Sequence, residues 1–192
     1  MWGLTSHTFE NWVYVESAFS KDECEEIIEL SNKYTKTDAT VGENVVTNHD
    51  IRKSTVAWIG YEGHPEAEWL YRKLTDYVNS VNEKFWEFDL TRIEPLQYTN
   101  YKDIGDYYQP HVDFFKTGAE QRKLSFSLQL TAPEDYDGGE LLFLPNSVDE
   151  EVAPKAQGTL ILFPSFIMHE VTPMERGERN SLVGWVRGPF FK

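Results

Sequence analysis

Short alternations of apolar and polar residues dominate the second half of the chain and predict a mainly β structure. Turn signals containing glycine or proline separate the strand candidates, which cover residues 92–101, 106–114, 124–131, 140–144, 158–163, 167–172 and 180–187. In 124–131 one face is apolar, and the other carries Ser125, Ser127, Gln129 and Thr131. We expect this polar face to line an enclosed pocket.

The first half predicts two helices between strand segments. Residues 11–19 alternate as a strand does, and Ser20 with Glu23 forms a capping box that starts a helix through about Tyr34. Its inward residues are Cys24, Ile27, Ile28 and Ser31. Residues 35–50 predict a polar loop, either a plain connection or a mobile lid that orders over a substrate. Residues 51–60 are expected to form another strand.

Pro65 is expected to open a long second helix, because proline suits the first helical turn. Apolar residues at helical spacing would pack it on a sheet: Leu70, Leu74, Tyr77, Val78, Val81 and Phe85. Seven or eight short strands after two helices predict a mainly β jelly-roll sandwich with helices packed on one sheet. At 192 residues we expect one domain, 1–192, with helical support over about 20–88 and a β-rich core over about 92–190.

Composition limits the partners and the compartment. A net charge of −14 is opposite to the basic footprint of a general nucleic-acid binder, so no nucleic-acid partner is expected. The single cysteine, Cys24, fits a reducing compartment. The first residues lack a signal-peptide pattern, and no apolar run approaches the roughly 20 residues that span a bilayer. We expect a soluble, cytoplasmic protein without a membrane partner.

His111-Val112-Asp113 is the stretch that carries candidate chemistry, together with His169 and Arg179 downstream. Two imidazoles and one carboxylate form the facial ligand set of non-haem Fe(II). Inside a strand an H-x-D step places both side chains on one face, so the third ligand would come from a neighbouring strand. The planar guanidinium of Arg179 suits a carboxylate, and a metal site with such a clamp is what a 2-oxoglutarate-dependent oxygenase needs. His64-Pro65-Glu66 has similar spacing, but a helix start explains it.

Less specific interpretations exist for each of these residues. His111 and His169 could be hydrogen-bonded core histidines, and Arg179 could be an ion-pair partner for one of the 32 acidic residues. A zinc hydrolase also uses two histidines and an acid, but it would leave Arg179 without a role. A jelly-roll binding module with a structural metal and no oxygenase activity is a further alternative. Metal-dependent turnover of 2-oxoglutarate distinguishes an oxygenase from both.

From about residue 51 to 190 the chain resembles the Fe(II)/2-oxoglutarate dioxygenases of the prolyl 4-hydroxylase type, and within them the PKHD-type hydroxylases. The segments that carry the resemblance are Gln97-Tyr98-Thr99-Asn100-Tyr101, Gly105-Asp106-Tyr107-Tyr108-Gln109-Pro110-His111-Val112-Asp113, Asp135-Tyr136-Asp137-Gly138-Gly139-Glu140-Leu141, Phe163-Pro164-Ser165, His169-Glu170-Val171-Thr172-Pro173 and Arg176-Gly177-Glu178-Arg179-Asn180-Ser181. The resemblance implies a double-stranded β-helix with iron at its open end.

The resemblance also implies roles for individual residues. His111, Asp113 and His169 would bind Fe(II), and Arg179 would pair with the distal carboxylate of 2-oxoglutarate. Further contacts with this co-substrate are expected from Tyr101, Ser181 and Gln129. Candidates for substrate binding are Arg52, Ser54 and Trp185. The implied reaction uses O₂, with ascorbate as an optional reductant, and hydroxylates a C–H bond while 2-oxoglutarate yields succinate and CO₂.

Two departures from related patterns bear on the substrate. Several prolyl hydroxylases use lysine where this chain has Arg179, which is the PKHD-like residue. Nucleic-acid demethylases of the same superfamily carry a second arginine where this chain has Trp185. We therefore expect the substrate to be a prolyl or other amino-acid or peptidyl residue, with a free small molecule as the alternative.

Overall fold

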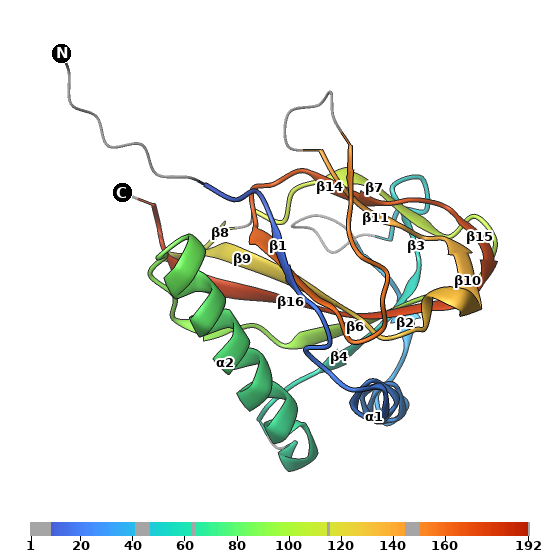
Figure 1. The fold of residues 1–192 in the computed structure, drawn as a ribbon, viewed down its shortest axis with the longest axis horizontal. Helices are drawn as coiled ribbons and strands as arrows, with labels where there is room; N and C mark the ends of the chain where they lie inside the picture. The colour runs from blue at the N-terminus through green and yellow to red at the C-terminus, as the bar shows by residue number, and fades with distance from the viewer. Residues whose placement is uncertain (1–8, 41–46, 63, 115, 145–149, 192) are drawn as a thin grey trace.

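Two β-sheets face each other in the computed structural model, and both helices cover the outer face of the larger sheet (Figure 1). The structure describes residues 9–40, 47–62, 64–114, 116–144 and 150–191. The mainly β jelly-roll fold with helices packed on one sheet is confirmed.

The larger sheet has nine strands, all paired antiparallel. Along its main path the order is β1 (Val13–Val15), β13 (Leu160–Pro164), β9 (Glu120–Gln129), β16 (Arg179–Pro189), β6 (Leu96–Tyr101), β4 (Thr55–Ile59) and β2 (Thr37–Asp38). Two short strands lie beside this path: β5 (Arg92–Ile93) pairs with β16, and β8 (Lys116–Thr117) pairs with β9.

The smaller sheet has five strands, in the order β12 (Glu151–Val152), β11 (Leu141–Phe143), β14 (His169–Val171), β7 (Tyr107–His111) and β3 (Arg52–Lys53). A separate two-stranded ribbon consists of β10 (Tyr136–Gly138) and β15 (Met174–Gly177), and a 3₁₀ turn, Pro133–Asp135, precedes it. The smaller sheet brings β7 and β14 side by side, although they are far apart in sequence.

The two helices are α1 (Lys21–Ser31) and α2 (Glu68–Phe85), the second preceded by a 3₁₀ turn, Pro65–Ala67. The predicted capping box is present: the Glu23 amide donates to the Ser20 hydroxyl, and the Ser20 amide donates to the Glu23 carboxylate. His64 and Glu66 lie at this 3₁₀ turn, as a helix start predicts. Within the described residues no helix is both long and apolar enough to cross a membrane.

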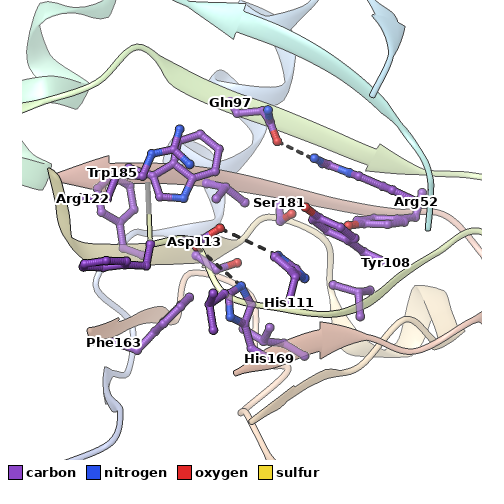
Figure 2. Close-up of a pocket in the computed structure, with 18 of the residues that line it drawn as sticks. Arg52, Gln97, Tyr108, His111, Asp113, Arg122, Phe163, His169, Ser181 and Trp185 are labelled. Atoms are coloured by element: carbon purple, nitrogen blue, oxygen red, sulfur yellow. Dashed lines mark hydrogen bonds and ion pairs between the residues drawn. The ribbon is translucent and has the colours of Figure 1, made fainter. Parts of the chain in front are cut away.

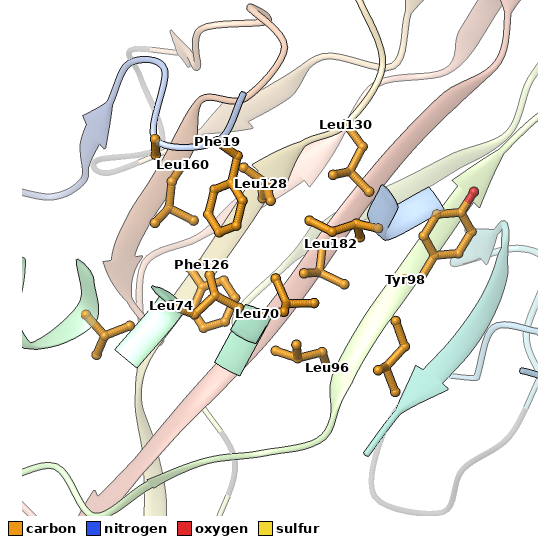
Figure 3. Packing of buried hydrophobic residues seen from close by; sticks show 14 of the residues in the cluster. Phe19, Leu70, Leu74, Leu96, Tyr98, Phe126, Leu128, Leu130, Leu160 and Leu182 are labelled. Carbon is orange, nitrogen blue, oxygen red and sulfur yellow. The ribbon is translucent and has the colours of Figure 1, made fainter. Parts of the chain in front are cut away.

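The main core lies between the helices and the larger sheet (Figure 3). On β9 the apolar face predicted from sequence packs there, with Phe126 and Leu128 fully buried. From the helices, Ile27, Leu70 and Leu74 meet this face. Because side chains alternate along a strand, the remaining residues of β9, β16 and β6 point between the two sheets. Because the apolar face packs against the helices, the polar face lies toward the space between the two sheets.

Several element boundaries differ from the sequence-based expectations. The first strand covers three residues instead of 11–19, and the first helix ends at Ser31 instead of about Tyr34. The expected strand 51–60 is divided at Ser54, so that β3 joins the smaller sheet and β4 joins the larger one. Within the 35–50 loop, Thr37–Asp38 forms a strand, and residues 41–46 lie outside the described residues.

Candidate active site

The two histidines and the aspartate of the predicted triad converge between the sheets. His111 is the last residue of β7, and His169 is the first residue of β14, its direct antiparallel partner. The Asp113 carboxylate oxygens lie 3.8 Å from His111 Nε2 and 3.5 Å from His169 Nε2. All three ligand atoms lie within 4.8 Å of one another. The expectation that His111 and Asp113 share one strand is wrong, because β7 ends at His111.

Hydrogen bonds to the backbone orient both imidazoles. His111 Nδ1 donates to the Gln109 carbonyl at 2.8 Å, and His169 Nδ1 donates to the Ile167 carbonyl at 2.9 Å. A carbonyl oxygen only accepts, so in each ring Nδ1 carries the proton and Nε2 keeps a free lone pair. Both Nε2 atoms face Asp113 (Figure 2). This is the tautomer and orientation that metal-ligating histidines need.

Burial sets the protonation of these ligands. Desolvation, reinforced by the nearby His169, lowers the pKa of His111 to about 3. Burial alone would raise the pKa of Asp113, but His169 and His111 outweigh it and the pKa is lowered. At neutral pH His111 is therefore neutral and Asp113 ionised, which are the forms that coordinate a metal ion.

A cavity of about 480 Å³ opens over the triad and is lined from both sheets. Its lower wall in Figure 2 carries the triad and Phe163, while Trp185, Arg122, Gln97 and Arg52 form the opposite side. Among the inward-facing polar residues of β9, Ser127 lines the cavity as predicted. The volume is within the range of small-molecule sites.

Arg179 lies at the start of β16, lines this cavity and is 1% exposed. Its Nη2 donates to the Gln129 side-chain oxygen at 3.0 Å, whereas its Nε has no hydrogen-bond partner among the described residues. No carboxylate of a described residue forms an ion pair with Arg179. A buried guanidinium with unused hydrogen-bond donors and no acidic partner is suited to an anionic ligand.

The other residues expected to contact the co-substrate divide into two groups. Tyr101 and Ser181 line the cavity, and the Tyr101 ring centroid lies 5.5 Å from the Arg179 guanidinium carbon. Gln129 does not line the cavity; it lies behind Arg179 and is also bonded through Nε2 to the Pro154 carbonyl. The structure therefore places Gln129 where it orients Arg179.

The residues expected to bind the substrate are divided in the same way. Arg52 and Trp185 line the cavity, whereas Ser54 stands behind Arg52 and accepts a hydrogen bond from its Nε at 3.0 Å. Trp185 stacks under the Arg122 guanidinium, whose carbon lies 3.9 Å from the ring centroid (Figure 2). Glu94 holds Arg122 through two hydrogen bonds of 3.0 and 2.8 Å.

Sequence analysis missed the cavity-lining residues Tyr108, Arg122, Gln97 and Trp58. Tyr108 stacks on His111 with ring centroids 3.5 Å apart, and burial raises its pKa to about 12. The alternation on β6, which places Gln97 on the same face as Tyr101, was a usable signal for Gln97. No sequence signal marked Arg122, because its position depends on Glu94, between β5 and β6, and on Trp185 of β16.

The donor set fits Fe(II) and an anionic ligand. His111, Asp113 and His169 would hold the metal ion, since two neutral imidazoles and one carboxylate are the facial set for non-haem iron. Arg179 would hold an anionic group in the same cavity. A jelly roll that encloses these two features is the framework of a non-haem iron oxygenase.

Comparisons with known proteins agree with this class. Residues 96–187 match the 2OG-Fe(II) oxygenase superfamily. A PKHD-type hydroxylase of Maricaulis maris is 41% identical over 90 residues, which are 46% of this chain and 40% of that protein. One from Synechococcus elongatus is 37% identical over 100 residues, 50% of this chain and 44% of that protein. This chain thus spans less than half the length of these relatives.

Solved structures share the fold. A prolyl-4-hydroxylase from Pseudomonas putida superposes with a TM-score of 0.75 and 22% identity over 94% of both chains. A Trichoplax adhaerens prolyl hydroxylase, solved with a peptide fragment of hypoxia inducible factor, gives a TM-score of 0.75 and 20% identity, over 92% of this chain and 83% of that one. Over residues 96–187 the chain is thus similar to the 2OG-Fe(II) oxygenase superfamily; it resembles PKHD-type hydroxylases in sequence and prolyl-4-hydroxylases in fold.

Proposed function

We propose that this chain is an Fe(II)- and 2-oxoglutarate-dependent dioxygenase that hydroxylates a C–H bond of a prolyl or other amino-acid or peptidyl residue. The observation that carries the proposal is the presence, in one cavity, of a two-histidine, one-aspartate ligand set and a buried arginine without an acidic partner. A metal site alone fits many activities. The additional anion site beside it is what 2-oxoglutarate requires.

The proposed roles follow from position. His111, Asp113 and His169 hold the metal ion through atoms already turned toward a common point. Bound Fe(II), with 2-oxoglutarate and O₂, supplies the oxidising chemistry, and succinate, CO₂ and the hydroxylated product leave. Arg179, held by Gln129, binds the distal carboxylate of 2-oxoglutarate. Tyr101 and Ser181 complete the walls of this subsite.

Apolar side chains limit water near the reacting groups. Leu141, Phe163 and Val171 line the cavity on the triad side and are buried. Excluding water strengthens the contact between Arg179 and its anion and protects reactive species from side reactions. Arg52 and Trp185, on the opposite wall, are the proposed substrate contacts, with Ser54 supporting Arg52.

Turnover of 2-oxoglutarate tests the proposal. We expect the purified protein to bind one Fe(II) per chain and to release succinate in an O₂-dependent way, with Mn(II) as an inert substitute. Mass spectrometry on peptide and amino-acid panels would show a gain of one oxygen atom in the substrate. A His111→Ala, His169→Ala variant that retains stoichiometric iron binding would contradict the ligand assignment. Folded, iron-loaded protein without 2-oxoglutarate turnover would favour a metal-binding module.

Other expectations remain part of the proposal. A peptide or amino-acid substrate is favoured over nucleic acid, because Trp185 occupies the position of a second arginine in the demethylases. A free small-molecule substrate is the alternative. The single-domain organisation, the cytoplasmic location and the optional use of ascorbate stay predictions.

A further inference from the structure

Arg52 is a buried cation whose hydrogen-bond partners are all neutral. It lines the cavity from β3, is 5% exposed, and donates through Nε to the Ser54 hydroxyl at 3.0 Å. Its Nη2 donates to the Gln97 side-chain oxygen at 2.9 Å and to the Thr99 hydroxyl at 3.4 Å. Nη1 makes no hydrogen bond, and no carboxylate forms an ion pair with this guanidinium, within the part of the chain that the structure describes.

Of the other two arginines that line the cavity, Arg122 has an acidic partner and Arg179 has a proposed anionic ligand. Glu94 pairs with Arg122 through a two-pronged contact and also pairs with Arg187. Arg179 also lacks an acidic partner, and the proposed function assigns it the distal carboxylate of 2-oxoglutarate. Removing a charge from water is costly unless a counter-charge replaces the solvent. Arg52 therefore has the same unmatched charge as Arg179, but no anionic group has yet been assigned to it.

Arg52 and Arg179 are anchored at different points along β6. The main-chain partner of Arg179 on β6 is Tyr101, whereas Arg52 is anchored to Gln97 and Thr99 of the same strand. Two to four residues along a strand correspond to about 7 to 13 Å. The anchors therefore place two separate cationic positions along one cavity wall.

The surroundings of Arg52 form a small set of hydrogen-bond donors near the triad. The amide nitrogen of Gln97 and the hydroxyl of Tyr108 both belong to cavity-lining residues and donate to no other described residue. Tyr108 lies between the Arg52 guanidinium, 4.6 Å from its ring centroid, and the His111 ring. Figure 2 shows this arrangement, with Arg52 bonded to Gln97 and Tyr108 beside His111. An anion at Arg52 would lie close to the metal ligands.

We propose that Arg52, assisted by Gln97, binds a carboxylate of the substrate, so that the enzyme selects an acidic substrate. The inference rests on the proposed oxygenase function and specifies the substrate of that same site. The carboxylate has two sources: the α-carboxylate of a free or C-terminal amino acid, or the side chain of Asp or Glu beside the target residue in a peptide. Both present the same group to the guanidinium.

Matched pairs of ligands that differ only in charge test the proposal. For the first source the pair is L-proline and L-prolinamide. For the second, proline-centred tripeptides with blocked ends carry Asp against Asn, or Glu against Gln, on either side. Each ligand is titrated into protein loaded with Mn(II) and 2-oxoglutarate, and tryptophan fluorescence reports binding because Trp58 and Trp185 line the cavity. The same pairs are then assayed with Fe(II) for stimulation of succinate release.

We expect the acidic member of at least one pair to bind roughly tenfold to a hundredfold more tightly than its amide. Arg52→Gln should abolish the preference, and Arg52→Lys should keep part of it because the charge remains. The matched control is Lys53→Gln, since the neighbouring Lys53 is paired with Asp106 at 3.3 Å. That variant should keep the wild-type preference.

Equal binding of both members in every pair would overturn the proposal, as would a preference that survives in Arg52→Gln. These binding results do not depend on turnover. If the acidic ligands bind through Arg52 while 2-oxoglutarate is not consumed, the proposed oxygenase function fails and the anion site stands. If 2-oxoglutarate is consumed without any acid preference, the reverse holds.

Discussion

Arg179 shows how one residue links the fold to the proposed chemistry. It is buried at the start of the long strand β16, and Gln129 holds one of its nitrogens while its Nε is free of partners. A structural arginine would normally have an acidic partner at this depth. Arg179 lines the cavity, and its remaining donors are suited to a planar carboxylate.

Replacing Arg179 should therefore damage co-substrate binding while leaving the metal site intact. Charge-assisted hydrogen bonds contribute roughly 1.5 to 3 kcal/mol each, so Arg179→Ala should raise the Michaelis constant for 2-oxoglutarate by about tenfold to several hundredfold. Arg179→Lys should recover part of the loss, because it restores a point charge without the fork. Steady-state succinate release at varied 2-oxoglutarate measures both effects.

Arg176→Ala is the matched control for this experiment. Arg176 lies three residues away, is largely exposed and pairs with Asp137. It should leave the Michaelis constant unchanged. A folded Arg179→Ala protein with normal dependence on 2-oxoglutarate would remove the main support for the proposed function.

Site residues were predictable from sequence where a local pattern carries the chemistry. His111, Asp113 and His169 follow from ligand type and spacing, and they converge as expected. The positions of Gln129 and Ser54 behind the two arginines were not predictable, because they depend on which side chain reaches farther into the cavity. Nothing in the sequence indicates that the partners of Arg52 are all neutral.

At the scale of elements, the capping box that starts α1 also contributes to the packing of the two helices. Ser20 and Glu23 satisfy each other's amides, and the Glu23 carboxylate also accepts hydrogen bonds from Lys73 of α2 at 2.6 and 2.7 Å. The same residues that start α1 thus connect it to the second helix. Both helices then cover the sheet whose inner face lines the cavity.

Ser20→Ala should lower the free energy of unfolding by about 1 kcal/mol, the usual contribution of an N-cap side chain. Binding of Mn(II) should not change, since α1 touches the outer face of the sheet. Urea denaturation and metal titration measure the two properties. Ser80→Ala, an exposed position within α2, is the control and should change stability by only a few tenths of a kcal/mol. A loss of metal binding in Ser20→Ala would show that the helix contributes to the site directly.

The major strands and both helices were predictable because their periodicity extends over five or more residues. Strands of two to four residues, such as β10 and β15, give no readable period, and pairing alone defines them. The division between β3 and β4 was missed for a related reason. Residues 51–60 read as one extended segment, but Ser54 is where the chain passes from one sheet to the other.

For the whole molecule, the partly buried, neutral His111 makes stability depend on pH. Its pKa in the folded protein is about 3, below the ordinary value of 6.5, so the unfolded chain binds a proton in that interval and the folded chain does not. Stability is therefore complete above about pH 6.5 and declines as the pH falls toward 3. The lowered pKa of Asp113 adds a further loss below its ordinary value of 3.8.

We expect metal-free protein to lose up to about 1.4 kcal/mol of stability per pH unit below about pH 6, from His111 alone. Urea denaturation between about pH 7.5 and 5 should show a shallower slope in His111→Gln than in the wild type. His49→Gln is the control, because His49 is largely exposed. Identical slopes for the wild type and His111→Gln would show that His111 titrates normally in the folded protein.

The backbone hydrogen bonds of the two histidines have a consequence for how such an enzyme can change. Each imidazole is held by a carbonyl only two residues earlier in its own segment, at Gln109 and at Ile167. The opposite wall, with Arg52, Gln97 and Trp185, comes from other strands. Mutations at Gln97 or Trp185 can therefore alter substrate contacts while these two hydrogen bonds stay in place. The residues that would hold the metal ion and those that would contact the substrate thus lie in different segments of the chain.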